Sequence, residues 1–378
     1  MNKALNRCYQ CMAEINEAIT ICPHCGFELH KQKTSPNALS PGTLLDNRYY
    51  LGNVIHINAE SIQYIAYDSH LDVVVDIKEF MPCSLATRTE EDSLVVQEKN
   101  QTLFNKLGVD FANLYHALSK LRTLSNLVQV YTIFAQNNTC YAVTEHLNCF
   151  TLREFLSDNY GEMPWEQVSG MFIDVLKTIN QLHHLGISHN GLSPETLFVT
   201  KEQTMKISGF SIMALRRKTG ELQTELFDGY AAPEQYDNSQ ACGTWTDVYS
   251  LAAVMYKTLT GTMPTESSTR AFNDNLIPPD VLNENVPKNV SIAIMSALTL
   301  SPKIRTQTMD DLFADVITPP RSTTQFSVNQ EVYYHDEPKN TESESKKYIL
   351  TAMGISLSIL LVGAAFLIFF IFEGQLFG

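Results

Sequence analysis

The chain has little positive charge. It carries 27 lysine and arginine residues against 41 aspartate and glutamate residues, so its formal net charge is −14. A surface that binds the phosphates of DNA or RNA needs a local excess of cations, so we do not expect nucleic acid as a partner. The plainest consequence of the negative charge is solubility of the folded protein.

An apolar leader is also missing from the start of the sequence. Residues 1–20 contain no hydrophobic run of the kind that a secretory signal peptide requires. We therefore expect a reducing compartment, in which scattered cysteines behave as small buried hydrophobes (Cys83, Cys140, Cys149 and Cys242). With 378 residues, 44% of them hydrophobic, the chain is long enough for two or more domains.

Near the end of the sequence, charge is missing altogether. Residues 348–372 contain no charged side chain, and about 25 residues at about 1.5 Å each span about 37 Å, enough for one transmembrane helix. A buried core helix is the alternative, but core helices are rarely so long. Lys346 and Lys347 precede this span and Glu373 follows it, so we expect the N-terminal bulk in the cytoplasm and 373–378 as a short extracytoplasmic tail. Small residues four apart within the span make homodimerisation a weaker inference (Gly354 and Ser358).

Four cysteines form two matched pairs near the N-terminus. Cys8-x-x-Cys11 and Cys22-x-x-Cys25 can each sit on a tight turn, and together they offer the four thiolates that a structural Zn²⁺ ion accepts. A pair of disulfides or a redox CxxC motif would be the alternatives, and a cytosolic location disfavours the first. The pattern resembles a zinc ribbon over residues 1–30, which we expect to fold only with its metal and to serve as a docking module.

Composition divides the rest of the chain. Residues 31–47 are rich in Pro, Ser and Asn and form a linker, and residues 318–347 are polar and predicted to be disordered. Between them, residues 48–317 carry an ordered series of motifs: Lys78, His189, Phe210, Ala232-Pro233-Glu234, Asp247, Leu259-Thr260-Gly261 and Arg305. This series resembles bacterial eukaryotic-type serine/threonine protein kinases over about 270 residues. The resemblance implies an α+β bilobal fold, with a small β-rich lobe and a large helical lobe.

The nucleotide side of the small lobe departs from that family. His56, Asn58 and Ser61 stand where the family has the three glycines of its phosphate-binding loop, and side chains there prevent a close approach to phosphate. Asp76 replaces the alanine of the V-A-I-K motif, which implies a carboxylate against the apolar face of adenine. Lys78 is retained and is the candidate for a residual nucleotide contact.

The retained lysine lacks its expected partner. By the family's register, the helix that supplies a glutamate to Lys78 corresponds to 111–121, and the glutamate position is Leu114. Asp110, four residues earlier on the same helix face, is the alternative acid. Without a partner, Lys78 is predicted to be a surface or cleft lysine with no catalytic duty.

The catalytic residues themselves are replaced. The family's H-R-D-x-x-x-x-N loop reads here with Asn190 and Gly191 in place of Arg and Asp, and with Thr196 in place of the metal-binding Asn. The aspartate of D-F-G is Gly209. Glycine offers no side-chain ligand, so we expect no Mg²⁺ site, and Glu195 is the nearest carboxylate in sequence to the Thr196 position.

The positions that serve folding are kept. By resemblance, His189 packs on Phe210, Asp247 anchors the catalytic loop through its backbone, and Glu234 pairs with Arg305. The sequence therefore predicts a membrane-anchored pseudokinase that binds cytosolic or membrane-associated signalling proteins, with zinc as its cofactor. A weak or non-standard ATP-dependent kinase and a nucleotide-binding switch stay open as alternatives. Thr219 and Thr224 are candidate phosphorylation positions, although an ordinary exposed loop is the favoured interpretation.

Overall fold

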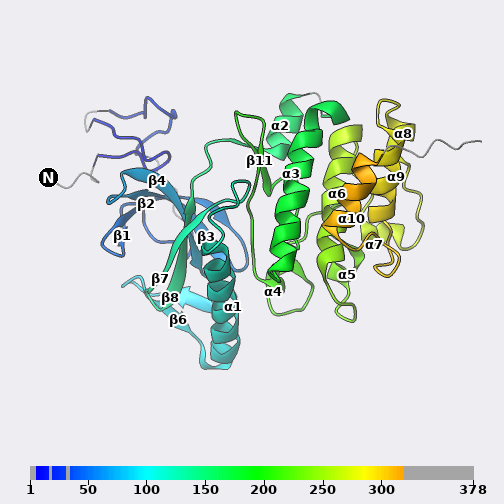
Figure 1. Cartoon of the computed structure of the whole chain (residues 1–378). Coiled ribbons are helices and arrows are strands. Elements are labelled where there is room, and N and C mark those ends of the chain that lie inside the picture. The colour runs from blue at the N-terminus through cyan, green and yellow to red at the C-terminus, as the bar shows by residue number, and fades with distance from the viewer. Residues whose placement is uncertain (1–5, 17–18, 31–34, 160, 319–378) are drawn as a thin grey trace, which may run out of the picture. The chain divides into compact units, whose positions relative to one another are not determined.

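The structure, a computed structural model, describes residues 6–16, 19–30, 35–159 and 161–318. These residues form a small lobe built on a β-sheet and a larger helical lobe, and the cysteine-bearing turns precede the small lobe (Figure 1). The predicted α+β, protein-kinase-like fold is confirmed. The predicted membrane helix at 348–372 lies outside the described residues, and no helix within the described ranges is long and apolar enough to cross a membrane.

The small lobe is an antiparallel sheet of six strands in the order β1-β2-β3-β4-β8-β7. Its strands are rich in Val, Ile and Tyr, the residues that fit a half-buried pleated surface. The hairpin between β7 and β8 turns at Asn137 and Asn138, which both have positive φ, as a two-residue hairpin turn requires. The strands are β1 (Leu44–Leu45), β2 (Tyr49–Ile57), β3 (Ser61–Asp68), β4 (Val73–Phe80), β7 (Val130–Gln136) and β8 (Thr139–Glu145), and a separate hairpin pairs β5 (Ala86–Arg88) with β6 (Leu94–Val96).

Helix α1 (Gln101–Ser119) packs against this sheet and is the counterpart of the helix that we predicted at 111–121. It begins ten residues earlier than predicted, after the short 3-10 turn η1 (Glu98–Asn100). The rings of Phe104 and Phe111 lie 5.2 and 5.5 Å from the ring of Phe80 at the end of β4. Aromatic packing therefore fixes the helix onto the strand that carries Lys78.

The large lobe is organised around α6 (Thr244–Thr260), which is buried along almost its whole length and ends at Gly261 with a φ of 67°. That left-handed residue is the usual way to terminate a helix. Around α6 lie the long amphipathic α3 (Trp165–His184) together with α9 (Lys288–Ala297) and α10 (Met309–Ile317) (Figure 1). The remaining elements are β9 (Phe150–Thr151), α2 (Leu152–Asp158), β10 (Leu197–Val199), β11 (Met205–Ile207), α4 (Met213–Arg216), α5 (Pro233–Tyr236), α7 (Ser267–Arg270) and α8 (Pro279–Leu282).

Candidate functional site: a kinase-like cleft filled by the chain's own side chains

Lys78 on β4 is buried and paired. Its Nζ lies 2.5 Å from Oε1 of Glu60, and the two side chains are 9% and 0% exposed. Burial by itself lowers the pKa of Lys78, but the charge of Glu60 outweighs it and raises that pKa above its usual value. The prediction of a partnerless surface or cleft lysine is therefore wrong. The partner comes from the turn between β2 and β3 and not from α1, where Leu114 joins the apolar core.

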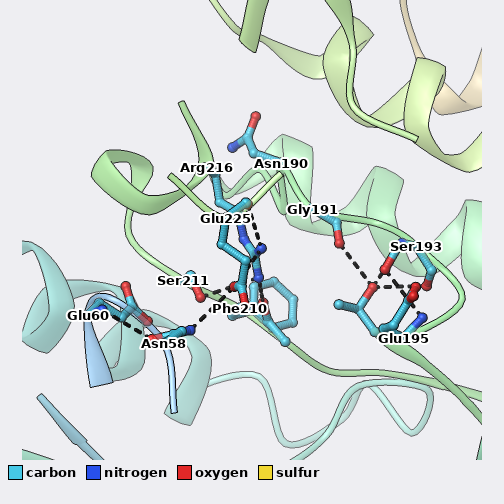
Figure 2. Close-up of polar contacts among 12 residues, drawn as sticks. Asn58, Glu60, Asn190, Gly191, Ser193, Glu195, Phe210, Ser211, Arg216 and Glu225 are labelled. Carbon is cyan, nitrogen blue, oxygen red and sulfur yellow. Dashed lines mark hydrogen bonds and ion pairs between the residues drawn. The ribbon is translucent and has the colours of Figure 1, made fainter. Parts of the chain in front are cut away.

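The Glu60 carboxylate also joins the two lobes. Its Oε2 accepts a hydrogen bond of 2.9 Å from the backbone N–H of Ile212, while Lys78 donates to the carbonyl of Phe210 at 2.9 Å. Ile212 and Phe210 flank Ser211, in the segment that corresponds to D-F-G, and Figure 2 shows Glu60 facing this segment. In active kinases this lysine contacts nucleotide phosphates. In this chain an internal carboxylate already neutralises it.

The turn that carries Glu60 is itself rigidly built. The Asn58 side-chain oxygen accepts hydrogen bonds from the backbone N–H groups of Glu60 (3.1 Å) and Ser61 (3.0 Å) and from the Ser61 hydroxyl (3.0 Å). Such side-chain closure of a turn replaces the freely adaptable glycine loop of the kinase family. The residues that stand at the glycine positions therefore hold Glu60 pointing inward.

A second polar cluster lies where the resemblance places adenine. Oδ1 of Asp76 is 2.8 Å from Nδ1 of His146, and the Gln63 amide donates to Oδ2 of Asp76 at 3.3 Å. The hydrogen bond to Asp76 raises the pKa of His146. Asp76 is thus not an isolated carboxylate facing a base, as its position in the motif suggested, but part of a link between three neighbouring segments.

Arg216, at the end of α4, occupies the space beside the catalytic loop. A Cβ atom on Gly191 would lie 2.7 Å from the Arg216 Nε, too close for a real contact. The guanidinium donates to the carbonyl of Gly209 at 2.8 Å and pairs with the Glu225 carboxylate at 3.0 Å (Figure 2). Glycine at position 191, the position of the catalytic aspartate, is what leaves room for this arginine.

Glu225 ties the small lobe to the same arginine. The Asn58 amide lies 3.4 Å from its Oε2, and the His56 ring lies 3.5 Å from its Oε1. Burial alone raises the pKa of Glu225, but the hydrogen bond with His56 and the charge of Arg216 outweigh it and lower that pKa to about 2. Two residues at the former glycine positions therefore contact an acid of the segment between Gly209 and Glu234, which corresponds to the activation segment of kinases.

The other replaced catalytic positions, Thr196 and Gly209, pack against each other and against Gly191. Gly209 has a φ of 77°, and a Cβ added there would lie 2.5 Å from Cγ2 of Thr196. The Thr196 hydroxyl is engaged by the backbone of its own loop, at 3.0 Å from the carbonyl of Gly191. Glu195, the nearest carboxylate in sequence, pairs with Arg153. The structure thus brings Gly191, Thr196 and Gly209 together, without a carboxylate among them.

The folding landmarks behave as the resemblance implies. The rings of His189 and Phe210 are 4.5 Å apart, and Asp247 accepts the backbone N–H groups of His189 (2.8 Å) and Asn190 (2.6 Å). His189 donates from Nε2 to the Ser208 carbonyl and accepts at Nδ1 from Gly191, so it is neutral, and burial lowers its pKa to about 4.

The large-lobe ion pair is also present. Arg305 meets both oxygens of Glu234, at 2.7 and 3.0 Å, and both side chains are fully buried. A bidentate pair of this kind is strong because each nitrogen donates to its own oxygen.

The four N-terminal cysteines form a candidate metal centre. Their sulfur atoms all lie within 4.8 Å of one another, with Cys8 3.7 Å from Cys25 and Cys11 3.8 Å from Cys22. A tetrahedral Zn²⁺ ion with bonds of about 2.3 Å separates its sulfur ligands by about 3.8 Å, whereas a disulfide needs about 2.05 Å. Burial raises the pKa of the Cys8 and Cys11 thiols, whereas at Cys22 burial is outweighed by hydrogen bonds from the backbone at His24 and Cys25, which lower the pKa of that thiol to about 7. The donor set therefore fits a structural zinc ion, which these four residues would hold with no open position for catalysis.

A two-lobed fold with a lysine on the third long strand of its sheet, a histidine-anchored loop and a buried Glu–Arg pair defines the class of protein-kinase-like domains. The sequence model described as "Protein kinase domain" matches residues 95–318. The chain belongs to the eukaryotic-type protein kinase family.

Several relatives are named as serine/threonine kinases. A probable serine/threonine-protein kinase of Clostridium acetobutylicum is 24% identical over 336 residues, which cover 80% of this chain and 48% of that protein. The serine/threonine-protein kinase PknB of Mycobacterium leprae is 26% identical, with coverage of 72% and 43%. A solved structure, described as the apo form of PpkA-294, aligns with a TM-score of 0.63 and 25% identity, covering 74% of this chain and 99% of that one. The chain spans less than half the length of these two curated relatives.

Proposed function

We propose that the protein is a pseudokinase that acts by binding other proteins and not by transferring phosphate. The proposal rests on one observation above all: Glu60 and Arg216 occupy, from within the chain, the places beside Lys78 and Gly191 where a kinase handles phosphate and substrate. Phosphoryl transfer depends on positioned Mg²⁺ and a catalytic carboxylate. Glycine at 191 and 209 and threonine at 196 supply neither the catalytic carboxylate nor a metal ligand at those positions, and the nearby carboxylates of Glu60 and Glu225 are paired with Lys78 and Arg216.

The setting that we propose is the cytoplasmic face of a membrane. The charge-free run at 348–372 supports a single-pass anchor, and the preceding Lys346 and Lys347 support a cytoplasmic bulk. Tethering raises the effective concentration of the kinase-like domain for membrane-associated signalling proteins. Zinc is the structural cofactor, held by the four N-terminal cysteines.

A transfer assay on the full chain tests the loss of catalysis. The protein is incubated with ATP labelled at the γ-phosphate, with Mg²⁺ or Mn²⁺, alone and with a general protein substrate. The Lys78→Met variant, shown by circular dichroism to be folded under the assay conditions, is the control. We expect no incorporation above that control. Incorporation that depends on Lys78 and on the metal contradicts the proposal and supports a non-standard kinase.

The anchor and the binding role have their own measurements. Membrane fractionation compares the full chain with a chain that ends at residue 345. We expect the full chain in the membrane pellet and the shortened chain in the supernatant. Affinity purification of both forms after crosslinking should recover the same specific proteins in repeated experiments. Recovery of none with either form contradicts the binding role.

A further inference from the structure

The first turn of the cysteine segment is attached to the small lobe by hydrogen bonds. The carbonyl of Tyr9, between Cys8 and Cys11, accepts the backbone N–H of Asn53 on β2 at 2.7 Å. The side chain of Asn53 donates to Gln10, in the same turn, at 3.1 Å. The turn that supplies two of the four cysteines is therefore bound to a strand of the kinase-like sheet.

Side-chain packing strengthens this attachment. Met12, which directly follows Cys11, is 1% exposed and forms a small apolar cluster with Ile65 and Tyr67 of β3. The guanidinium of Arg7 lies 3.5 Å above the centre of the Tyr67 ring. Both contacts come from residues next to a cysteine ligand, so their positions depend on the shape of the turn that the metal would fix.

Gly52 on β2 is explained by the same contact. A Cβ atom there would lie 2.1 Å from Cε of Met12 and 2.4 Å from the carbonyl oxygen of Tyr9. Glycine inside a strand weakens it unless another part of the chain approaches closely. At this position the approaching part is the cysteine turn, so the sequence of β2 is adapted to it.

We propose that the zinc centre is a brace of the kinase-like small lobe, so that metal binding at the four cysteines stabilises strands β2 and β3. A segment of about 30 residues without a core of its own keeps its shape only with the metal. Loss of the metal therefore removes the Tyr9, Met12 and Arg7 contacts together. Since β2 runs from its contact with the cysteine turn towards Asn58 and Glu60, the brace supports the strand that leads into the turn carrying Glu60, the partner of Lys78.

This inference does not depend on whether the cleft binds nucleotide, so it can fail while the proposed function stands. It also limits the predicted role of the ribbon as a free docking module. The first cysteine turn is engaged by the chain's own small lobe, whereas Pro23, His24 and Cys25 of the second turn are exposed.

Hydrogen exchange on the full chain tests the brace. Zinc content is measured first, and exchange is then compared between the zinc-loaded protein and protein stripped by a chelator. We expect backbone amides of β2 and β3 to exchange about tenfold faster or more without zinc, which corresponds to about 1.4 kcal/mol of opening free energy. Exchange in α6, in the large lobe, should stay unchanged and report that the chain is still folded.

Two joint variants change the contact between the first cysteine turn and strands β2 and β3 without removing a metal ligand. Gly52→Ala should accelerate exchange in β2 and β3 while zinc content stays the same, and Met12→Ala should do so more weakly, without a backbone clash. Gly170→Ala is the matched control, because a Cβ on Gly170 meets nothing within 4 Å. The proposal is overturned if the protein binds no zinc, if zinc removal leaves β2 and β3 unchanged, or if both joint variants behave like Gly170→Ala.

Discussion

The pair of Lys78 and Glu60 gives the sharpest quantitative prediction. Both charges are buried, with Nζ and Oε1 at 2.5 Å, and each is the other's closest neutralising partner. Removing one member leaves the other as an uncompensated charge in the interior, which costs about 3–5 kcal/mol. We therefore expect Glu60→Gln alone and Lys78→Met alone to lower the free energy of unfolding by that amount.

The double variant decides between pairing and simple packing. If the two side chains neutralise one another, Glu60→Gln with Lys78→Met should cost less than the sum of the two single changes. We expect a coupling free energy of about 2 kcal/mol, within the range that contacting residues show. Urea unfolding followed by tryptophan fluorescence and circular dichroism, at fixed pH and zinc content, measures all four proteins.

A more exposed ion pair, between α1 and the segment that follows Gly209, serves as the control. Lys106 and Glu221 also contact one another, but their side chains are 57% and 31% exposed, so solvent screens their attraction. The same cycle at that pair should give a far smaller coupling. Equal coupling at the two pairs, or none at Glu60 and Lys78, would refute the reasoning.

Three further predictions concern the large lobe. Burial lowers the pKa of His189 from its usual 6.5 to about 4, so as the pH falls from 6.5 to 4 the unfolded state binds a proton first. The free energy of unfolding of the wild type should therefore drop by up to about 3 kcal/mol between pH 6.5 and pH 4. Urea titrations of His189→Gln should lack this pH-dependent loss. Arg305→Met strands the buried Glu234 and should cost about 3–5 kcal/mol, seen as a lower urea midpoint. Gly191→Ala forces a Cβ to within 2.7 Å of Arg216 and should cost about 1–3 kcal/mol in thermal unfolding; no loss would contradict the packing described for Arg216.

The parts of the fold that depend on short motifs at fixed spacing could be predicted from the sequence. The contacts of Asp247 with the catalytic loop and of Glu234 with Arg305 follow from short motifs that match those of the kinase family. The closeness of the four cysteines likewise follows from two CxxC pairs. In each case the chemistry needs particular residue types at particular intervals, so the interval carries the information.

The filling of the cleft could not be obtained in that way. Alignment with the family's motifs put the partner of Lys78 on a helix, at Leu114. In the structure Glu60 pairs with Lys78 from the turn between β2 and β3, which lies close in space. Arg216 filling the space at Gly191 depends on the path of the activation segment. Two features of the sequence pointed to this arrangement. One is an acid, Glu60, within the region of the family's glycine loop, and the other is glycine where a large side chain approaches, as Arg216 approaches Gly191. The attachment of the cysteine turn to β2 was missed for the same reason, although Gly52 in a strand marked the place of close approach.

The most direct measurement of the central claim is thermal unfolding of the zinc-loaded full chain. The unfolding temperature is compared with and without millimolar ATP, in the presence and in the absence of Mg²⁺. A ligand at 100 times its dissociation constant adds about 2.7 kcal/mol of stability, which gives a clear rise in the unfolding temperature. A cleft filled by Glu60 and Arg216 predicts no rise under any of these conditions. A rise with ATP alone would contradict it in favour of a nucleotide switch, and a rise that requires Mg²⁺ would contradict it in favour of an enzyme.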